Sequence, residues 1–421
     1  MISFAWFNNL SRYRKASLST LGAMLVLSIV RIIANADDIT SSGTVSSALR
    51  VATPLLLAGL AALWSERAGI VNIAVEGMMV VGSWLGGFGA WHWGSWAGIG
   101  LAILGGALVG LIHAVATVHF NVDHVVSGIA VNILAAGTTE YLSIIAFKGQ
   151  KGGGESQSPT GKGGYGEFDM PFLAGGRIGN WKSPDMLGWL ERKHNVPLLP
   201  DLAAFLRGIV SDIYVHTVLA LLLVPATVII LWRTRFGLRL RSSGESPQAG
   251  ESLGVRINLI RYQALAIAGG LAAFGGAYLS CVFTSTYRQG QVAGQGYIGL
   301  ATNIFGNWNP LGVLRGALLF GFPTALKYRD EKNIPALFLV AAIVMFLAVV
   351  VMVLKKRLNA ALVCGALTAL AMYAYIVVDE VPQDWVAATP YIVTLVVLAG
   401  ARQQLRPPAH AGIPYRAGES H

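Results

Sequence analysis

The sequence has few charged residues and very few cysteines. Asp, Glu, Lys and Arg make up 12% of its 421 residues, whereas a soluble globular chain carries about 25%. The two cysteines, Cys281 and Cys364, lie in apolar stretches and support neither a disulfide framework nor a metal site. The low charge indicates instead that a lipid bilayer is the main solvent.

Motifs for catalysis and nucleotide binding are also missing. The chain has no Gly-x-x-x-x-Gly-Lys-Ser/Thr loop and no His-Glu-x-x-His pair, so it cannot bind ATP phosphates in the P-loop manner or zinc in the metalloprotease manner. His113, His119 and His124 do not have the spacing of a zinc site either. We therefore expect no catalytic residue, no metal and no cofactor in this chain.

Apolar runs of about 17–25 residues, the length that crosses a bilayer, recur along the chain. They predict an all-α polytopic membrane protein with about 10–12 transmembrane helices. The expected helices lie at 17–34, 45–64, 70–91, 95–119, 124–147, 213–232, 262–283, 293–307, 311–327, 334–354, 361–378 and 387–401.

The net charge of +10 is distributed as in a membrane protein, not as in a nucleic-acid-binding one. Basic residues gather in the stretches 233–261 and 355–357, whereas Asp37 and Asp38 lie in a short loop without Lys or Arg. Because short cytoplasmic loops carry the excess of Lys and Arg, we place 233–261 and both termini in the cytoplasm. We expect the lipid bilayer to be the environment of the chain, and we expect no nucleic-acid partner.

The chain divides into membrane parts and loops. We expect an N-terminal membrane half at 1–147, an extracytoplasmic loop at 148–212, a C-terminal membrane half at 213–401 and a cytoplasmic tail at 402–421. Each half holds a glycine-interrupted polar segment, Gly69–Gly82 and Gly294–Asn309. Such paired segments are typical of transporters with inverted repeats and a site near the middle of the bilayer.

Glu76 is the strongest candidate for a transport pathway. An ionisable group within a membrane helix usually faces the bundle interior or an aqueous cavity, and Asn72, four residues earlier, would share its helical face. A structural role, in which Glu76 bonds backbone groups at a helix break, is the alternative. The remaining candidates are polar or aromatic groups of two other segments: Asn132, Glu140, Asn303, Phe305 and Trp308.

Two of these candidates have other interpretations. Trp308 near a membrane end would more commonly be an interface anchor, and an amide such as Asn72 commonly hydrogen-bonds between helices.

In the cytoplasmic stretch, Ser246 before Pro247 is typical of a helix start, and Gly254 of a helix end. This predicts a short surface helix over 247–253.

Four ordered motifs resemble one family. They are Glu66–Met78, Gly244–Val255, Gly306–Gly312 and Gly412–Arg416, and together they look like the motifs of permease subunits in bacterial ABC importers for nucleosides and simple sugars. These permeases belong to the branched-chain amino-acid/ribose permease superfamily. Gly250 and Ala68 depart from the family pattern, where alanine and serine are usual.

The resemblance implies a subunit of a larger importer. Its partners would be a cytoplasmic ABC ATPase that uses the ATP, a second permease subunit that forms a heterodimeric pore, and an extracytoplasmic solute-binding protein. The short cytoplasmic helix would dock on the ATPase. The residues implied in that coupling are Glu245, Pro247, Gln248, Ala249, Glu251, Ser252 and Leu253.

The expected function is therefore solute import by alternating access across the bacterial inner membrane. A nucleoside is the preferred solute and a simple sugar the next. A stand-alone ion-coupled secondary transporter is the alternative, since Glu76 would suit proton coupling, and a polytopic membrane enzyme is a weaker one.

Overall fold

The chain is almost entirely helical. A computed structural model describes residues 12–162, 166–193, 198–327, 335–354, 356–378 and 405–415. The strands among these residues are two residues long: β1 Glu167–Phe168, β2 Arg177–Ile178, β3 Trp181–Lys182 and β4 Ile213–Tyr214. Strands β2 and β3 form an antiparallel pair. The all-α prediction is confirmed.

Seven helices in the described part of the chain are long and apolar enough to cross a bilayer. They are α3 (Ser42–Arg67), α5 with the π-helical turn η2 (Ser95–His119), α6 (His124–Phe147), α9 (Val215–Arg233), α12 with the π-helical turn η3 (Ile257–Phe283), α15 (Pro335–Leu354) and α16 (Leu358–Val377). Helices α2 (Arg12–Ala34) and α14 (Pro310–Lys327) contain shorter apolar stretches. The protein is thus a multi-pass membrane protein, and the predicted crossing at 387–401 lies outside the described residues.

The chain forms two compact units. The smaller contains residues 1–48, 168–213 and 322–393, and the larger contains residues 49–167, 214–321 and 394–421. These units divide the chain at other positions than the membrane halves expected from the sequence, and the division into halves stays a prediction.

In the smaller unit, helices α7 (Met186–Glu191) and α8 (Leu199–Val210) lie in the stretch expected to be an outer loop. Arg207 of α8 pairs with Asp185 at 2.9 Å and with Glu191 at 3.1 Å.

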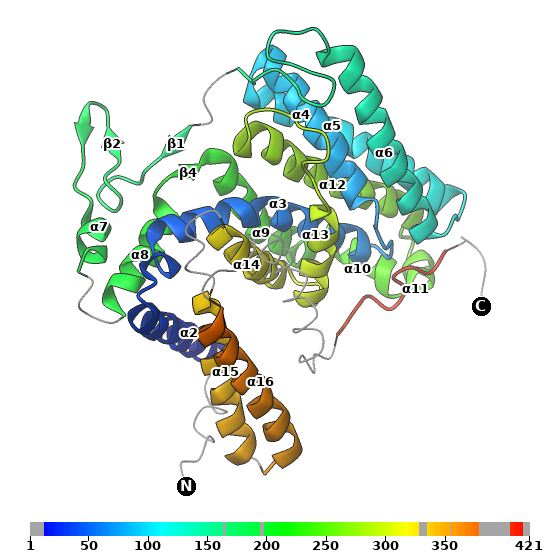
Figure 1. Cartoon of the computed structure of the whole chain (residues 1–421). Helices are drawn as coiled ribbons and strands as arrows, with labels where there is room; N and C mark the ends of the chain where they lie inside the picture. Colours follow the sequence, from blue (N-terminus) through cyan, green and yellow to red (C-terminus); the bar gives the residue numbers. More distant parts are fainter. Residues whose placement is uncertain are drawn as a thin grey trace. The chain divides into compact units, whose positions relative to one another are not determined.

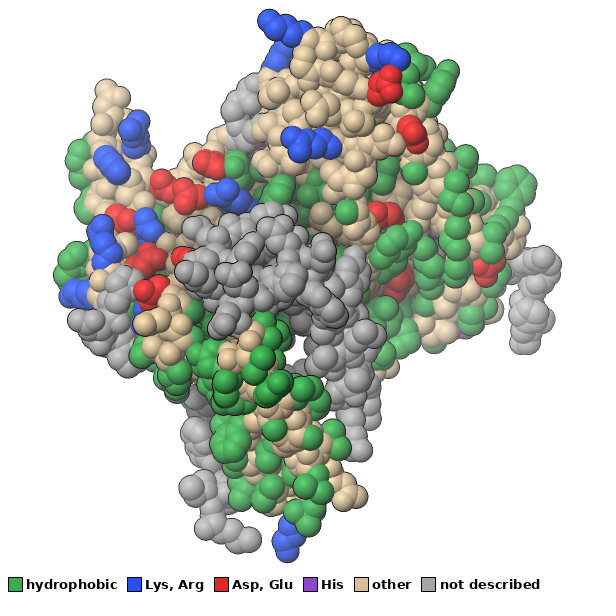
Figure 2. Space-filling model, viewed as in Figure 1, with side chains coloured by type: hydrophobic (Ala, Val, Ile, Leu, Met, Phe, Trp, Pro, Cys, Tyr) green, Lys and Arg blue, Asp and Glu red, His purple; other side chains and the backbone are tan. Residues whose placement is uncertain are grey.

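Helices α15 and α16 pack against each other and carry a largely apolar surface (Figure 2). Such a surface suits contact with lipid.

The core of the larger unit is built from α4 (Val75–Trp93), α5 and α12, which pack side by side (Figure 1). Small residues permit this packing. A Cβ atom on Gly106 of α5 would lie 2.4 Å from the carbonyl oxygen of Gly269 on α12. Any side chain at either position would therefore push these two helices apart.

The helix expected at 70–91 begins later than predicted. Gly69 has a φ of +95°, and its N–H bonds to Glu66 O at 2.9 Å while Ile70 N–H bonds to Ser65 O at 3.0 Å. This is a glycine-terminated helix end, and α4 starts only at Val75. The prediction that Asn72 and Glu76 share a helical face was wrong, because Asn72 lies in the break between α3 and α4.

The stretch 233–261 holds two helices where one was predicted. Helix α11 (Pro247–Ser252) matches the predicted short helix, and Gly254 follows it with a φ of +80°. Ser246 occupies the N-cap position, but its side chain makes no capping hydrogen bond. The preceding α10 (Arg235–Glu245) was not predicted. Its N-cap Thr234 accepts the N–H of Gly237 through its hydroxyl oxygen.

Candidate functional site

Glu76 connects the start of α4 to the start of α13 (Gln295–Phe305). Its Oε1 accepts the N–H of Gly294 at 2.9 Å, and its Oε2 accepts the N–H of Gly296 at 2.7 Å. Gly294 is the N-cap residue of α13 and has a left-handed φ of +82°. A carboxylate is stabilising at this helix end, where backbone N–H groups lack partners. Glu76 therefore has the structural role given as the alternative.

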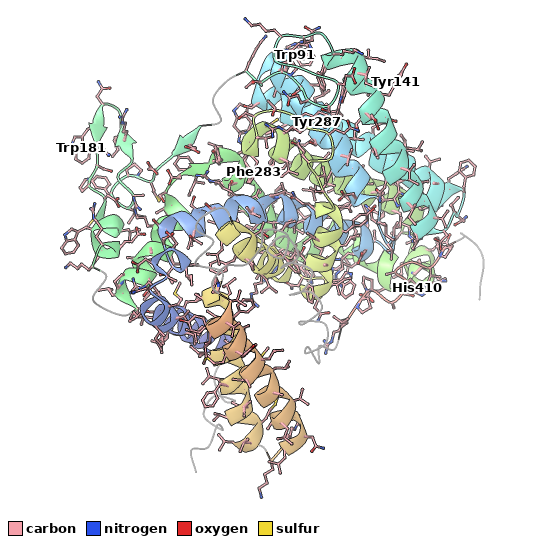
Figure 3. All side chains as sticks on the ribbon, in the orientation of Figure 1. Trp91, Tyr141, Trp181, Phe283, Tyr287 and His410 are labelled. Carbon is pink, nitrogen blue, oxygen red and sulfur yellow. The ribbon has the colours of Figure 1, made fainter. Side chains whose placement is uncertain are left out.

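Glu76 also lines a cavity of about 310 Å³ in the larger unit. Its walls come from α4, from α6 and from the loop between η3 and α13, which carries Tyr287 (labelled in Figure 3). The polar groups on these walls include Ser83, Glu140 and Gln291. A volume of roughly 300 Å³ lies at the lower end of the range for small-molecule pockets. Glu76 is thus both structural and exposed to a solute-sized space.

Glu140 of α6 is the acidic group on the cavity wall that remains available for a ligand. It is exposed and belongs to the residues that line the cavity. Asn132, two turns earlier on α6, is fully engaged. Its Oδ1 accepts Gly77 N–H at 2.7 Å, while its Nδ2 donates to Ile73 O at 3.1 Å and to Tyr297 Oη at 3.0 Å. Asn132 therefore braces α6 against α4.

Asn303 and Trp308 converge on a different carboxylate, Glu66. Asn303 Nδ2 donates to Glu66 Oε2 at 3.0 Å, and Trp308 Nε1 donates to the same oxygen. Arg67 Nη2 donates to the carbonyl oxygen of Trp308 at 2.6 Å. The Trp308 side chain is only 7% exposed, so its interpretation as an interface anchor was wrong.

Asn72 and Phe305 contact other partners. Asn72 is fully buried and donates to Met78 Sδ at 3.8 Å, and Phe305 packs against Phe320 with ring centroids 5.6 Å apart. Of the predicted pathway residues, Glu76 and Glu140 thus line the cavity, and Asn303 and Trp308 bond Glu66. Glu66 itself was missed, although it is a carboxylate at the end of an apolar run and inside the first family motif.

Helix α11 presents most of its side chains outward. Pro247 and Gly250 are buried, Gln248 is half-buried, and Ala249, Glu251 and Ser252 are exposed. Leu253, which follows the helix, is 84% exposed. A large apolar side chain so open to solvent suits a contact with another protein.

Two neighbouring features of α11 have structural explanations. Glu245 belongs to the end of α10 and pairs with Arg67 at 3.5 Å. Gly250–Gly254 has the spacing Gly-x-Ser-x-Gly, but a nucleophile elbow needs a strand-to-helix turn. Here Ser252 lies at the end of a helix, and its hydroxyl donates to Ala249 O at 2.9 Å.

The sequence model of the family described as branched-chain amino acid transport system / permease component matches residues 44–354. This range includes both carboxylates, the cavity and α11. The chain belongs to this family. The permease is therefore a membrane transport component and not an enzyme.

Relatives with transport names match most of the permease. The guanosine ABC transporter permease protein NupQ of Bacillus subtilis is 28% identical over 89% of this chain and 97% of its own length. The nucleoside ABC transporter permease protein NupC of Lactococcus lactis is 32% identical over 73% of this chain and 90% of its own length. A protein of Haloferax volcanii, provisionally named glucose ABC transporter permease protein TsgC13, is 33% identical over 69% of this chain and 79% of its own length. No solved structure matches the permease.

Proposed function

We propose that this permease is the membrane subunit of an ATP-driven importer that moves a nucleoside across the inner membrane of a bacterium. The observation that carries the proposal is the likeness to relatives named for guanosine and nucleoside transport, which extends over 89% and 73% of this chain, respectively. A simple sugar is the second candidate, because a further relative is provisionally named for glucose.

The solute pathway is proposed to include the cavity beside Glu76. A nucleoside and a simple sugar both carry several hydroxyl groups, and a carboxylate accepts hydrogen bonds from hydroxyls. Glu140 is exposed on the cavity wall and is the group proposed to accept them. Glu76, whose oxygens already bond Gly294 and Gly296, holds the wall formed by the start of α13.

Helix α11 is proposed to dock on a cytoplasmic ABC ATPase, which binds and hydrolyses the ATP. Its exposed residues and the neighbouring Leu253 would enter a groove of that protein and move as a rigid body when it closes. The proposal includes a second permease subunit, an extracytoplasmic binding protein, and cytoplasmic termini. Basic residues in the α10 region support this orientation.

Reconstitution of the complete complex tests the function. The permease is copurified with its ATPase and incorporated into liposomes, and the binding protein is added on the opposite side of the membrane from the ATPase. Guanosine is expected to accumulate on the ATPase side, and only when ATP is present on that side. Glucose, a free nucleobase and an amino acid serve as competitors. Concentrative uptake by the permease alone, driven by a proton or sodium gradient, would contradict the proposal and favour the secondary transporter.

A second part of this experiment tests the docking role of α11. Replacing Gln248, Glu251 and Ser252 together by alanine is expected to lower uptake per ATP hydrolysed while leaving the permease in the membrane. The triple replacement of Gln150, Glu155 and Ser156 is a matched control, because it removes the same three side-chain types from exposed positions of another loop. Equal uptake by both variants would contradict docking through α11.

A further inference from the structure

The C-terminal segment Leu405–Tyr415 crosses the ends of several helices in the larger unit and runs beside α11 (Figure 1; His410 is labelled in Figure 3). Four of its backbone N–H groups donate to acceptors outside the segment. The bonds run from Arg406 to Asn307 Oδ1 at 2.8 Å, from Ala409 to Glu245 Oε2 at 3.2 Å, from His410 to Gly244 O at 2.9 Å and from Gly412 to Gly69 O at 3.0 Å. The segment thus contacts the α13–α14 turn, the end of α10 and the end of α3.

The sequence of the C-terminal segment favours this ordered path. Pro407, Pro408 and Pro414 restrict their own backbone, which lowers the entropy lost on ordering. Gly412 has a φ of +84°, and a Cβ atom there would lie 3.3 Å from Val71 Cγ2. These residues explain the glycine and proline of the last family motif.

Tyr415 connects the C-terminal segment to α11. The residue is 6% exposed, and its phenol donates to the carboxylate of Glu251 on α11. Burial, and then the hydrogen bond to Glu251, raise the pKa of Tyr415 to about 12, so the hydroxyl keeps its proton at physiological pH. The guanidinium of Arg261 lies over the Tyr415 ring, 5.4 Å from its centroid, within the range of a cation–π contact.

Helix α11 has little else to fix its position. It has six residues, far fewer than an isolated helix needs to be stable. Within the described residues, the bond from Tyr415 to Glu251 is the hydrogen bond that joins an α11 side chain to a residue outside the helix. Packing of Pro247 and Gly250 supplies the remaining support.

The same tyrosine is linked to the end of α3 through buried groups. Arg261 is 1% exposed, and its Nε donates to Ser243 Oγ at 3.3 Å. The Ser243 hydroxyl donates in turn to Ala68 O at 2.9 Å. Ala68 follows Glu66 and Arg67, the residues that bond Asn303 and Trp308. A displacement of α11 would therefore be transmitted to α3 through Tyr415.

We propose that Tyr415 is a positioning residue for transport: the C-terminal segment, through Tyr415, holds α11 in the orientation in which its movement reaches α3. This rests on the proposed docking of α11 on an ATPase. The segment then acts as part of the coupling machinery and not as a passive tail.

The first test is Tyr415→Phe in the full complex, which removes the hydroxyl and keeps the ring. Uptake per ATP hydrolysed is expected to fall about threefold or more, because the free energy of a hydrogen bond to a charged group is large enough for an effect of this size. Tyr373→Phe, at an exposed tyrosine of α16, is the matched control and should leave the ratio unchanged. In a Glu251→Ala background Tyr415→Phe should have no further effect, because both changes remove the same bond. An unchanged ratio, or additive losses, overturns the proposal.

The second test measures position directly. Amide hydrogen exchange of residues 250–253, whose N–H groups are hydrogen-bonded within the helix, is expected to rise about tenfold in Tyr415→Phe in the full complex. It is expected to stay unchanged in Tyr373→Phe, because local opening becomes easier only when a bond of roughly 1.4 kcal/mol is lost. Unchanged exchange overturns the proposal even if transport falls. If the wild-type complex shows no ATP-driven uptake, the proposed function fails, while the exchange result still decides whether Tyr415 holds α11.

Discussion

Glu66 and Glu76 hold opposite ends of α13 with different sets of atoms. Glu76 bonds the start of α13 with both oxygens, each accepting one backbone N–H, from Gly294 and from Gly296. Glu66 bonds the far end with one oxygen, Oε2, which accepts side-chain donors from Asn303 and Trp308. Both are carboxylates, but their tolerance of substitution should differ.

The difference teaches which of the two sites needs a carboxylate. An amide has one acceptor oxygen and one NH2 donor group. Glutamine can replace Glu66, because a single oxygen accepts both bonds there. It cannot replace Glu76 without placing its NH2 against a backbone N–H. Two acceptor oxygens are therefore expected to be required at Glu76, and one acceptor oxygen at Glu66.

The largest effect is expected for Glu76→Gln. One of the two N–H groups of Gly294 and Gly296 would lose its acceptor, and an unsatisfied buried donor costs about 1–3 kcal/mol. We expect ATP-driven uptake to fall tenfold or more, with the permease still present in the membrane. Glu155→Gln, at an exposed carboxylate of the 148–212 loop, is the control. Equal uptake by both variants would remove Glu76 from the transport account.

A smaller effect is expected for Trp308→Phe. The phenyl ring keeps most of the buried contact area but lacks the indole N–H that donates to Glu66. Glu66 would keep its bond from Asn303, so the expected loss of stability is about 1–2 kcal/mol, measured as a lower thermal midpoint of the purified complex. Trp93→Phe, at a tryptophan that is 67% exposed, should leave the midpoint unchanged. An unaltered midpoint in Trp308→Phe would mean that its bond to Glu66 adds no stability.

The smallest effect is expected for Glu66→Gln. The amide oxygen can accept from both Asn303 and Trp308, so we expect a change of less than about 1 kcal/mol in the same thermal assay. Glu66→Ala, which leaves both donors without an acceptor, is the reference for full loss. A Glu66→Gln variant as unstable as Glu66→Ala would show that the negative charge is required.

Much of the helical framework could be predicted from the sequence, because uninterrupted apolar runs of sufficient length have one stable structure in a bilayer. The failures have local causes. The stretch after Gly69 is apolar enough to suggest helix, but Gly69 adopts a left-handed conformation that ends α3. The many arginines of α10 are typical of a basic loop, so no helix was predicted there. However, Phe236 and Leu240 have helical spacing and lie on its more buried side.

The candidate site could be predicted only in part. Glu76 was recognisable as an isolated carboxylate in an apolar segment. Its partners were not, because they are backbone N–H groups of glycines and carry no side-chain signal. Glu66 was overlooked because it stands beside Arg67 at a helix end, where charged residues are expected. Only the fold brings Asn303 and Trp308 to it.

Amide hydrogen exchange at the two ends of α13 tests the central claim most directly. In Glu76→Gln, exchange is expected to rise at residues 294–298 and to stay unchanged at 303–308, whereas Glu66→Gln should leave both ends near the wild-type rates. Faster exchange at 303–308 in Glu66→Gln, with no change at 294–298 in Glu76→Gln, would contradict the account.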